Sequence, residues 1–457
     1  MQLLNNDTIC AIATPPGVGG LGVVRMSGRN ACEILDMIWR GGVDPKALEP
    51  RKLHLGNIFR DGHIIDRVMA VMMPSPNTYT GQDVVEFSCH GSPVVLKKIM
   101  DLCIASGARP AGPGEFTRRA FLAGKMDLAQ AEAVCDLIHA SSEAAARQAF
   151  EQLSGGLSKK LSEIAEGLLE LRALVEASID FPEEDLTFIE NDDTAGKISL
   201  LEEKLRKISD TFNEGKLIKN GVRTAIVGKP NVGKSSILNA LAGSDRAIVY
   251  HEPGTTRDVI EQDVVIDGIL FHLRDTAGIR PTSCGVESAG VMRSKNEMKN
   301  ADLILVVIDS SIPPDDEDIS LVEKAGRDRC IIVCNKTDLT GAFNPLECLG
   351  KFGCKVMGIS AKVGTGLTET AAAMADFVSE NRRHHDSALI TSQRHRDTIE
   401  KTRSHLLKAA SLLSEKASAE FLAEELRYAH ERLGEITGET ASDDVLNRIF
   451  SEFCIGK

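Results

Sequence analysis

The spacing of apolar residues changes along the chain and separates it into four stretches. Residues 1–118 carry short apolar runs, such as Leu21–Met26, Ile64–Met73 and Val84–Ser88, which are split by Gly, Pro and Asp-Gly turns. Short runs between turn residues are typical of an α+β domain. We therefore expect a first, α+β domain over residues 1–118.

A helical period begins at Asp127 and predicts a long amphipathic helix pair within residues 119–216. We expect the pair to be broken near Gly155-Gly156 and stopped at Phe181-Pro182. The apolar positions with steps of three and four residues are Leu128, Ala131, Cys135 and Ile138, and then Leu161, Ile164, Leu168, Leu171 and Val175.

Residues 217–380 alternate strand and helix patterns, the arrangement of a doubly wound parallel sheet. From residue 381 the helical period returns, and a last helix is expected over Asp443–Phe453 with Val445, Ile449 and Phe453 buried. Since neither helical stretch has enough apolar surface to stand alone, we expect one discontinuous all-α domain, residues 119–216 and 381–457, into which the α/β domain is inserted. The later stretch has a mostly apolar face of Phe421, Leu422, Glu425, Leu426, Ala429 and Leu433.

Composition limits the environment and the partners. With 53 basic and 66 acidic residues among 457, the net charge is −13, which argues against coating by nucleic acid through bulk electrostatics. The eleven cysteines have no metal-ligand spacing, and we interpret Cys330 and Cys334 as buried apolar residues. Free cysteines of this kind are compatible with a reducing cytosol. Neither a signal peptide nor a membrane-spanning run is evident, and we expect a soluble cytoplasmic protein.

One motif introduces chemistry. Residues 228–235 read Gly-Lys-Pro-Asn-Val-Gly-Lys-Ser directly after the apolar strand Thr224–Val227, which fits the phosphate-binding P-loop pattern. Its backbone N–H groups can face the β-phosphate, Lys234 can bridge β- and γ-phosphates, and the Ser235 hydroxyl can bind Mg²⁺. The alternative is a Gly-rich strand-to-helix turn without a ligand.

Three later motifs predict guanine as the base. The Asp338 carboxylate in Asn335-Lys336-Thr337-Asp338 can accept hydrogen bonds from N1–H and the exocyclic amine of guanine, whereas adenine has no donor at N1. Residues 360–362, Ser-Ala-Lys, would close the base pocket, and residues 275–278, Asp-Thr-Ala-Gly, would sense the γ-phosphate. Four motifs in this order predict a GTPase with a Ras-like sheet.

With these motifs embedded in helices, the chain resembles the bacterial tRNA modification GTPases called the MnmE or TrmE family. Thr14–Gly17, the run Gly114–Phe121 and the terminal Cys454-Ile-Gly-Lys457 carry the resemblance, which covers essentially the whole chain. It implies a homodimer that works with the flavoprotein MnmG, also called GidA. Together they would install an aminomethyl or carboxymethylaminomethyl group on the wobble uridine of certain tRNAs, using GTP hydrolysis and a folate one-carbon unit.

The resemblance also supplies parts that the motifs lack. Ile279 follows the Asp-Thr-Ala-Gly motif where Ras-like enzymes carry a water-positioning glutamine, and Glu287 aligns with the family's water-positioning glutamate. A K⁺ ion is implied in place of an arginine finger, with Thr256 as the second Mg²⁺ contact. The implied K⁺ ligands are Asn231, Tyr250, Glu252 and Thr255.

Together, the motifs and the resemblance predict a catalytic group of Glu287, Lys234, Asn231 and Cys454. Because Pro253 could stiffen the loop, K⁺ binding there needs testing. The predicted GTP contacts are Asn231, Val232, Gly233, Lys234, Ser235, Ser236, Tyr250, His251, Glu252, Pro253, Gly254, Thr255, Thr256, Asp275, Thr276, Ala277, Gly278, Asn335, Lys336, Asp338, Ser360, Ala361 and Lys362.

A second site rests on the resemblance alone. Recognition of 5-formyltetrahydrofolate or a related folate maps onto Arg25, Glu86, Lys125 and Lys457, where a carboxylate could accept from a pterin and cations could meet carboxylates. Cys454 beside Lys457 would act near the one-carbon chemistry. Taken without the family, each of these charged residues is a surface charge or a member of a half-buried ion pair, and Cys454 is an inert thiol.

Two other functions remain open. An RNA-binding GTPase switch in ribosome assembly would share the P-loop, but those proteins usually append a small basic domain. A folate-dependent one-carbon transferase acting on a protein would leave the GTPase unexplained.

Overall fold

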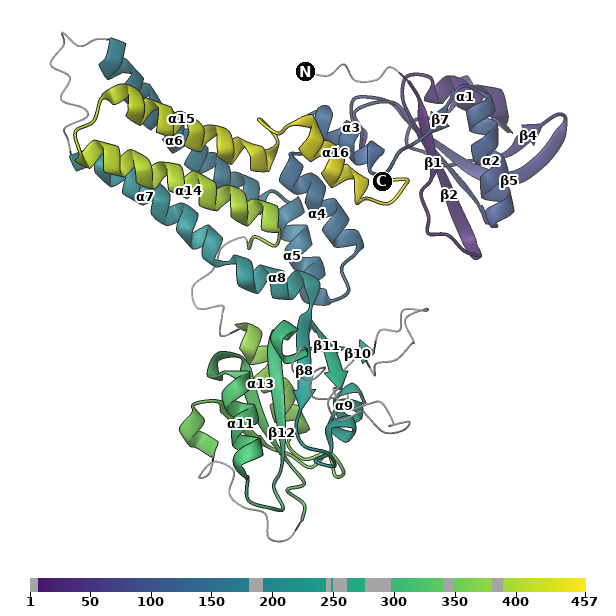
Figure 1. Cartoon of the computed structure of the whole chain (residues 1–457). Coiled ribbons are helices and arrows are strands. Elements are labelled where there is room, and N and C mark those ends of the chain that lie inside the picture. The colour runs from purple at the N-terminus through teal and green to yellow at the C-terminus, as the bar shows by residue number, and fades with distance from the viewer. Residues whose placement is uncertain are drawn as a thin grey trace, which may run out of the picture. The chain divides into compact units, whose positions relative to one another are not determined.

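The computed structural model describes residues 7–180, 192–243, 248–249, 261–275, 297–339, 349–379 and 389–457. The chain divides into two compact units. Figure 1 labels their helices and strands. Unit 1 comprises Met1–Cys135, Leu153–Lys197 and Ser404–Lys457, and unit 2 comprises Asp136–Gln152 and Ile198–Arg403.

Unit 1 begins with a seven-stranded sheet in the order β3-β4-β5-β6-β2-β1-β7. Neighbouring strands are antiparallel except β1 and β7, which are parallel. Helices α1 and α2 pack against the sheet, and Trp39, Phe87 and Ile99 are fully buried between them. The bounds are β1 Ile9–Ile12, β2 Gly19–Ser27, α1 Ala31–Ile38, β3 Trp39–Gly41, β4 His54–Arg60, β5 His63–Met73, β6 Val84–Gly91, α2 Pro93–Ala105 and β7 Arg109–Pro110.

The helices of unit 1 come from both ends of the chain. Helix α6 packs along α15. Leu161 and Leu168 are buried on α6, and Leu426 and Leu433 are buried on α15. Residues far apart in sequence therefore share one helical core, which confirms the discontinuous helical domain. The bounds are α3 Glu115–Leu122, α4 Leu128–Ile138, α6 Gly156–Asp180, α15 Ala419–Thr437 and α16 Asp443–Ser451.

Two details of the helical prediction were wrong. The region from Asp127 forms three helices rather than two, because α4 ends at Ile138 and α5 (Glu143–Leu153) begins after Ser142. The Ser142 hydroxyl accepts a hydrogen bond from the Ala145 N–H at 3.2 Å and so starts a new helix. Phe421, expected on the apolar face of α15, is 59% exposed.

The buried face of α16 differs from the expected one at Val445 and Ile449, whereas Phe453 is buried as expected. Leu446, Phe450 and Phe453 are buried against Leu128 and Ala131 of α4, and Val445 and Ile449 are only partly buried. Both sets follow helical spacing, so the period alone could not choose between them. The expected return of the short tail onto the protein is confirmed, because Ile455 pairs with Pro113.

Unit 2 contains the second seven-stranded sheet, in the order β14-β13-β12-β8-β11-β10-β9. Strands β14 to β11 of this order are parallel, while β10 and β9 are antiparallel to their neighbours. Helices pack on both faces, over one core with Leu273 and Val333 and another with Val306 and Ile332. This is the doubly wound α/β fold predicted for the inserted domain.

The carboxyl ends of the parallel strands lie at the same edge of the sheet, because parallel strands run in one direction. Helix α8 leads into β8 through Gly221, whose φ is +75°. The bounds are α7 Asp192–Asp210, α8 Phe212–Asn220, β8 Val222–Val227, α9 Lys234–Ala242, β9 Ile248–Val249, β10 Glu261–Ile266, β11 Ile269–Asp275, β12 Leu303–Asp309, α11 Asp316–Ala325, β13 Cys330–Asn335, β14 Lys355–Gly358, α13 Leu367–Ser379 and α14 Gln393–Ser414.

Candidate functional site

The P-loop joins the central strand β8 to α9, and two glycines fix its path. Gly228 has a φ of +152°, and a Cβ there would lie 2.3 Å from the Val307 carbonyl oxygen. Gly233 has a φ of +99°, and a Cβ there would lie 2.2 Å from Nδ2 of Asn335. No side chain fits at either place, so the loop backbone packs directly against the neighbouring strand ends.

Lys234 opens α9, and its ammonium lies inside the loop. Nζ donates to the carbonyl oxygens of Gly228 at 2.8 Å and Lys229 at 2.7 Å. Burial lowers the pKa of Lys234, and the negative charge of Asp275 opposes that shift. The loop therefore holds a cation at the N-terminus of a helix, a place suited to an anion.

Ser235 and Asp275 are brought together from different elements. Asp275 ends β11, and its Oδ2 accepts a hydrogen bond from the Ser235 hydroxyl at 2.6 Å. These two oxygen ligands fit Mg²⁺, which in nucleotide sites takes few protein ligands and keeps water and phosphate oxygens. No cluster of three or more His, Cys, Asp or Glu side chains suited to a metal occurs in the described part of the chain.

Asn335 ends β13 and joins the P-loop to the base-side loop. Its Nδ2 donates to the Val232 carbonyl oxygen at 2.8 Å, and its Oδ1 accepts from the Ala361 N–H at 3.0 Å. The side chain is 3% exposed. One amide thus positions two of the predicted nucleotide-binding segments.

Asp338 is held ready as an acceptor. The Ser360 hydroxyl donates to its Oδ1 at 2.6 Å, and this hydrogen bond lowers the pKa of Asp338. Lys336, with a φ of +68°, directs its Nζ to Asp309 at 2.5 Å. Lys362 is exposed, and its charge also lowers the pKa of Asp338. The carboxylate therefore stays ionised near the expected base pocket.

The other P-loop predictions are placed as follows. Asn231 is exposed and has a φ of +64°, Val232 is buried, and Ser236 is exposed on α9. Several predicted residues lie outside the described residues: Tyr250, His251, Glu252, Pro253, Gly254, Thr255, Thr256, Thr276, Ala277, Gly278 and Glu287.

A cavity of about 150 Å³ in unit 1 contains three of the four predicted folate contacts. Arg25 on β2 pairs with Glu86 on β6 at 2.6 Å and donates to the Gly456 carbonyl oxygen at 3.3 Å. Lys457 also lines the cavity, where burial and then the charge of Arg25 lower its pKa, and Glu86 opposes them. The chain end is thus folded against the N-terminal sheet.

Sequence reasoning missed other walls of this cavity, namely Tyr79, Thr80 and Phe116. Burial raises the pKa of Tyr79, whose hydroxyl lies 3.0 Å from that of Thr117. The Arg25 guanidinium lies 5.8 Å from the centre of the Phe116 ring. Phe116 belongs to the run Gly114–Phe121, which carries part of the family resemblance and could have pointed to this cavity.

Lys125 and Cys454 lie outside the lining of the cavity. Lys125 is exposed, beside Gly81. Cys454 is also exposed, and its carbonyl oxygen accepts from the N–H groups of Gly114 at 3.5 Å and Lys457 at 3.4 Å. The tail is therefore anchored through backbone atoms.

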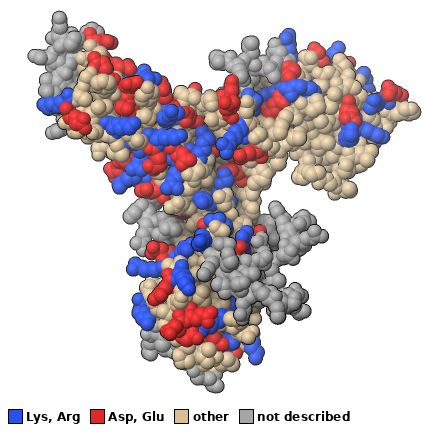
Figure 2. All heavy atoms as spheres, in the orientation of Figure 1, with Lys and Arg blue, Asp and Glu red and all other residues tan. Residues whose placement is uncertain are grey.

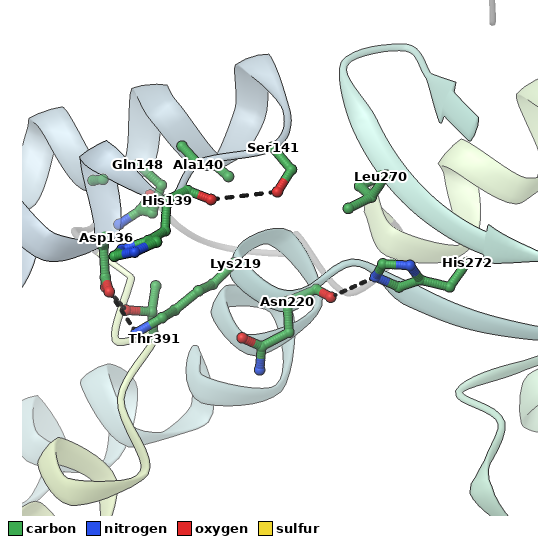
Figure 3. Close-up of a pocket in the computed structure, with 12 residues that line it drawn as sticks. Asp136, His139, Ala140, Ser141, Gln148, Lys219, Asn220, Leu270, His272 and Thr391 are labelled. Atoms are coloured by element: carbon green, nitrogen blue, oxygen red, sulfur yellow. Dashed lines mark hydrogen bonds and ion pairs between the residues drawn. The ribbon is translucent and has the colours of Figure 1, made fainter. Parts of the chain in front are cut away.

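A cavity of about 270 Å³ lies within unit 2, and the motifs gave no sign of it (Figure 3). Lys219 pairs with Asp136 at 2.7 Å, and His272 on β11 bonds the Asn220 carbonyl oxygen at 3.0 Å. Thr391 also bonds Asp136, at 3.4 Å. These polar side chains pair with one another, so we interpret the cavity as part of the internal packing of unit 2.

The doubly wound sheet, P-loop, Ser235–Asp275 pair and base-side loops define a P-loop GTPase. The MnmE helical domain model matches residues 128–454, and the model of the GTP-binding protein TrmE N-terminus matches residues 8–125. The chain belongs to the MnmE family of tRNA modification GTPases, and it is an enzyme of that class.

Full-length relatives support this membership. The tRNA modification GTPase MnmE of Alkaliphilus oremlandii is 42% identical over 99% of each chain, and that of Acetivibrio thermocellus is 41% identical over 100% of each. Among solved structures, the G domain of the T. maritima FeoB iron transporter is 25% identical, covering 35% of this chain and 98% of its own, with a TM-score of 0.27. Within the described residues, no helix is long and apolar enough to cross a membrane.

Proposed function

We propose that this chain is the GTP-hydrolysing component of a complex that adds an aminomethyl or carboxymethylaminomethyl group to C5 of the wobble uridine in certain tRNAs. The observation that carries most weight is the Asn335 bridge between the P-loop and the base-side loop. Because it joins the loop that carries Lys234 to the loop whose Ser360 bonds Asp338, it supports a single site in which Lys234 would meet the phosphates and Asp338 would meet guanine. The assignment of tRNA as the substrate rests on membership of the MnmE family.

In this proposal each described side chain has one task. Lys234 neutralises charge that develops between the β- and γ-phosphates, and Ser235 and Asp275 hold Mg²⁺. Asp338, which is exposed in this structure, selects guanine, because a carboxylate that the base covers would lose its hydrogen-bond partners against adenine. Glu287 would position the attacking water and Thr256 would complete the Mg²⁺ site.

K⁺ dependence of hydrolysis is part of the proposal. Asn231, the described member of the implied ligand set, sits exposed on the P-loop with a side-chain oxygen available to a cation. A monovalent cation beside the phosphates would stabilise the transition state. We expect faster GTP turnover in K⁺ than in Na⁺ at equal ionic strength, and equal rates would remove the cation from the mechanism.

Glu287→Ala should separate water positioning from nucleotide binding. We expect slower hydrolysis with nearly unchanged GTP affinity, since an interaction made only in the transition state affects turnover. Asp338→Asn is the matched variant and should instead weaken GTP binding. A Glu287→Ala enzyme that mainly loses GTP affinity would make the residue a structural part of its loop.

The folate site is proposed for the cavity around Arg25 and Glu86. At about 150 Å³ it is smaller than typical ligand pockets and would hold one end of a folate. Glu86 could accept from a pterin edge, and Arg25 and Lys457 could meet a carboxylate. Bound 5-formyltetrahydrofolate would supply the one-carbon unit. Lys125 has a weaker case because it lies outside the cavity lining.

The proposed partners are a second copy of the chain, the flavoprotein MnmG, and tRNA. On the face shown in Figure 2, Lys and Arg are interspersed with Asp and Glu over the helices. This mixture, with a net charge of −13, favours local tRNA contacts or contacts made by the partner.

The deciding experiment is nucleoside analysis of tRNA from cells that lack this chain. We expect loss of the C5 modification at the wobble uridine and its return with the wild-type gene but not with Asp338→Asn. Copurification with tagged chain should recover a flavoprotein. Normal wobble uridine together with a ribosome-assembly defect would favour the assembly switch instead.

A further inference from the structure

Two cysteines stand opposite each other on neighbouring parallel strands of unit 2. Cys330 is the first residue of β13, and Cys354 directly precedes β14. The register pairs Ile331 with Lys355, so the residues before them are neighbours across the sheet. Adjacent strands lie about 4.8 Å apart, and a disulfide joins Cα atoms about 4.4–6.8 Å apart.

The two side chains lie on the same face of the sheet. Cys330 belongs to the buried cluster that contains Ile332, and Cys354 and Val356 pack against that cluster. The Cys354 thiol donates to the Phe352 carbonyl oxygen at 3.8 Å, and its partner for cross-linking is the cysteine at the neighbouring strand position. Both are free thiols in this structure. No backbone shift between strands is therefore needed to bring the sulfur atoms together.

The two thiols differ in access. Cys330 is 5% exposed, whereas Cys354 is half-buried at the edge strand of the sheet. The Arg327 side chain lies beside Gly353, within 3.8 Å of where a Cβ would stand. Cys354 is thus the thiol that an oxidant reaches first.

We propose that Cys330 and Cys354 are an oxidant-responsive modification site that forms a reversible disulfide when the protein meets hydrogen peroxide. The Cys354 thiolate attacks one peroxide oxygen, the O–O bond breaks, and a sulfenic acid and one water form after protonation. The Cys330 sulfur then attacks the sulfenic sulfur. An S–S bond forms, and the sulfenic oxygen leaves with the thiol proton as a second water.

The order of the two steps follows from burial. Burial raises the pKa of the Cys330 thiol well above its ordinary value, and the negative charge of a Cys354 thiolate adds to the shift. A buried protonated thiol reacts slowly with peroxide but can trap a sulfenic acid that forms at the neighbouring position of the next strand. In a reducing cytosol the pair rests as thiols, and exchange with a small thiol restores it after oxidation.

The cross-link would act on the nucleotide site through the strands. At its far end, β13 carries Asn335, and β14 leads to Ser360 and Ala361. The Ala361 N–H donates to Asn335, so the two strand ends must stay in register for the bridge to form. A bond across their other ends restricts their separation, and we expect slower GDP release from the oxidised protein.

The test treats the folded, full-length protein with hydrogen peroxide, blocks thiols with N-ethylmaleimide and identifies linked peptides by mass spectrometry. We expect one linked peptide containing Cys330 and Cys354, and two fewer alkylated cysteines than the eleven of the reduced chain. Dithiothreitol should restore both. Because this measurement uses the wild-type chain, it does not depend on how well variants fold.

Cys334→Ala is the matched control, since Cys334 lies on the same strand opposite Gly358. It should keep the cross-link, and Cys354→Ala should abolish it together with the slower release of a fluorescent GDP analogue. Absence of the linked peptide, or oxidation of Cys354 to sulfinic acid without linkage, would overturn the proposal. Unchanged GDP release in a fully cross-linked protein would overturn its effect on the nucleotide site.

Discussion

Replacing Asn335 by alanine should weaken guanine nucleotide binding by breaking the link between the P-loop and the base-side loop. The mutation removes the bonds to the Val232 carbonyl oxygen at 2.8 Å and from the Ala361 N–H at 3.0 Å. A buried partner left unsatisfied costs about 1–3 kcal/mol. Val232 is buried and Ala361 is only partly buried, so the two together cost about 2–4 kcal/mol. At the lower end this corresponds to an affinity loss of about 30-fold.

Some of this cost will appear in the free energy of unfolding rather than in binding. The nucleotide-free loops can separate and let water satisfy Val232 and Ala361, whereas nucleotide binding must bring them together again. Titration with a fluorescent GDP analogue measures the loss of binding free energy. Thermal unfolding of the free and GDP-bound protein measures the loss in the free energy of unfolding. Asn239→Ala is the control, because Asn239 is exposed on α9.

Asn335→Asp tests the two bonds separately. It keeps an acceptor for the Ala361 N–H but places a carboxylate against the Val232 carbonyl oxygen, so we expect a loss of affinity at least as large as that of alanine. An Asn335→Ala protein that binds GDP within twofold of wild type, with unchanged unfolding, would refute the idea that this amide assembles the site.

Other predictions concern stability and the second site. Burial alone would raise the pKa of Glu115, but hydrogen bonds from Arg109, the Gly112 N–H and Arg119 lower it to about 2. The unfolded value is higher, so this contribution, about 3 kcal/mol, is present above pH 4.5 and is lost as the pH falls toward 2. Glu115→Gln should reduce stability at neutral pH and flatten acid unfolding over that window. Gly221→Ala should destabilise unit 2, because φ is +75° and a Cβ would lie 2.6 Å from Nε2 of His272. Its control, Gly196→Ala within α7 with open space around it, should stabilise the helix slightly in the same thermal scan. Cys454→Ser should leave GTP turnover unchanged and impair wobble-uridine modification; full modification would eliminate the thiol as a participant.

Local patterns were enough to predict most of the elements and the phosphate-binding loop. The apolar run Thr224–Val227 followed by the Gly-rich loop specified β8, the turn and the start of α9, because the required residues are consecutive. The strands that carry Asp275 and Asn335 were also predictable from short apolar runs. For the same reason the motifs identified Lys234 before any contact was known.

Tertiary structure decided which distant groups meet and which helical face is buried. Asn335 and Val232 are 103 positions apart, and Arg25 and Gly456 are 431 apart, so no spacing rule joins them. In α16 two overlapping sets of apolar residues both fit a helix, and packing against α4 selected Leu446 and Phe450. Periodicity describes one element at a time. Burial depends on the surface that another element presents, and that surface exists only once the chain has folded.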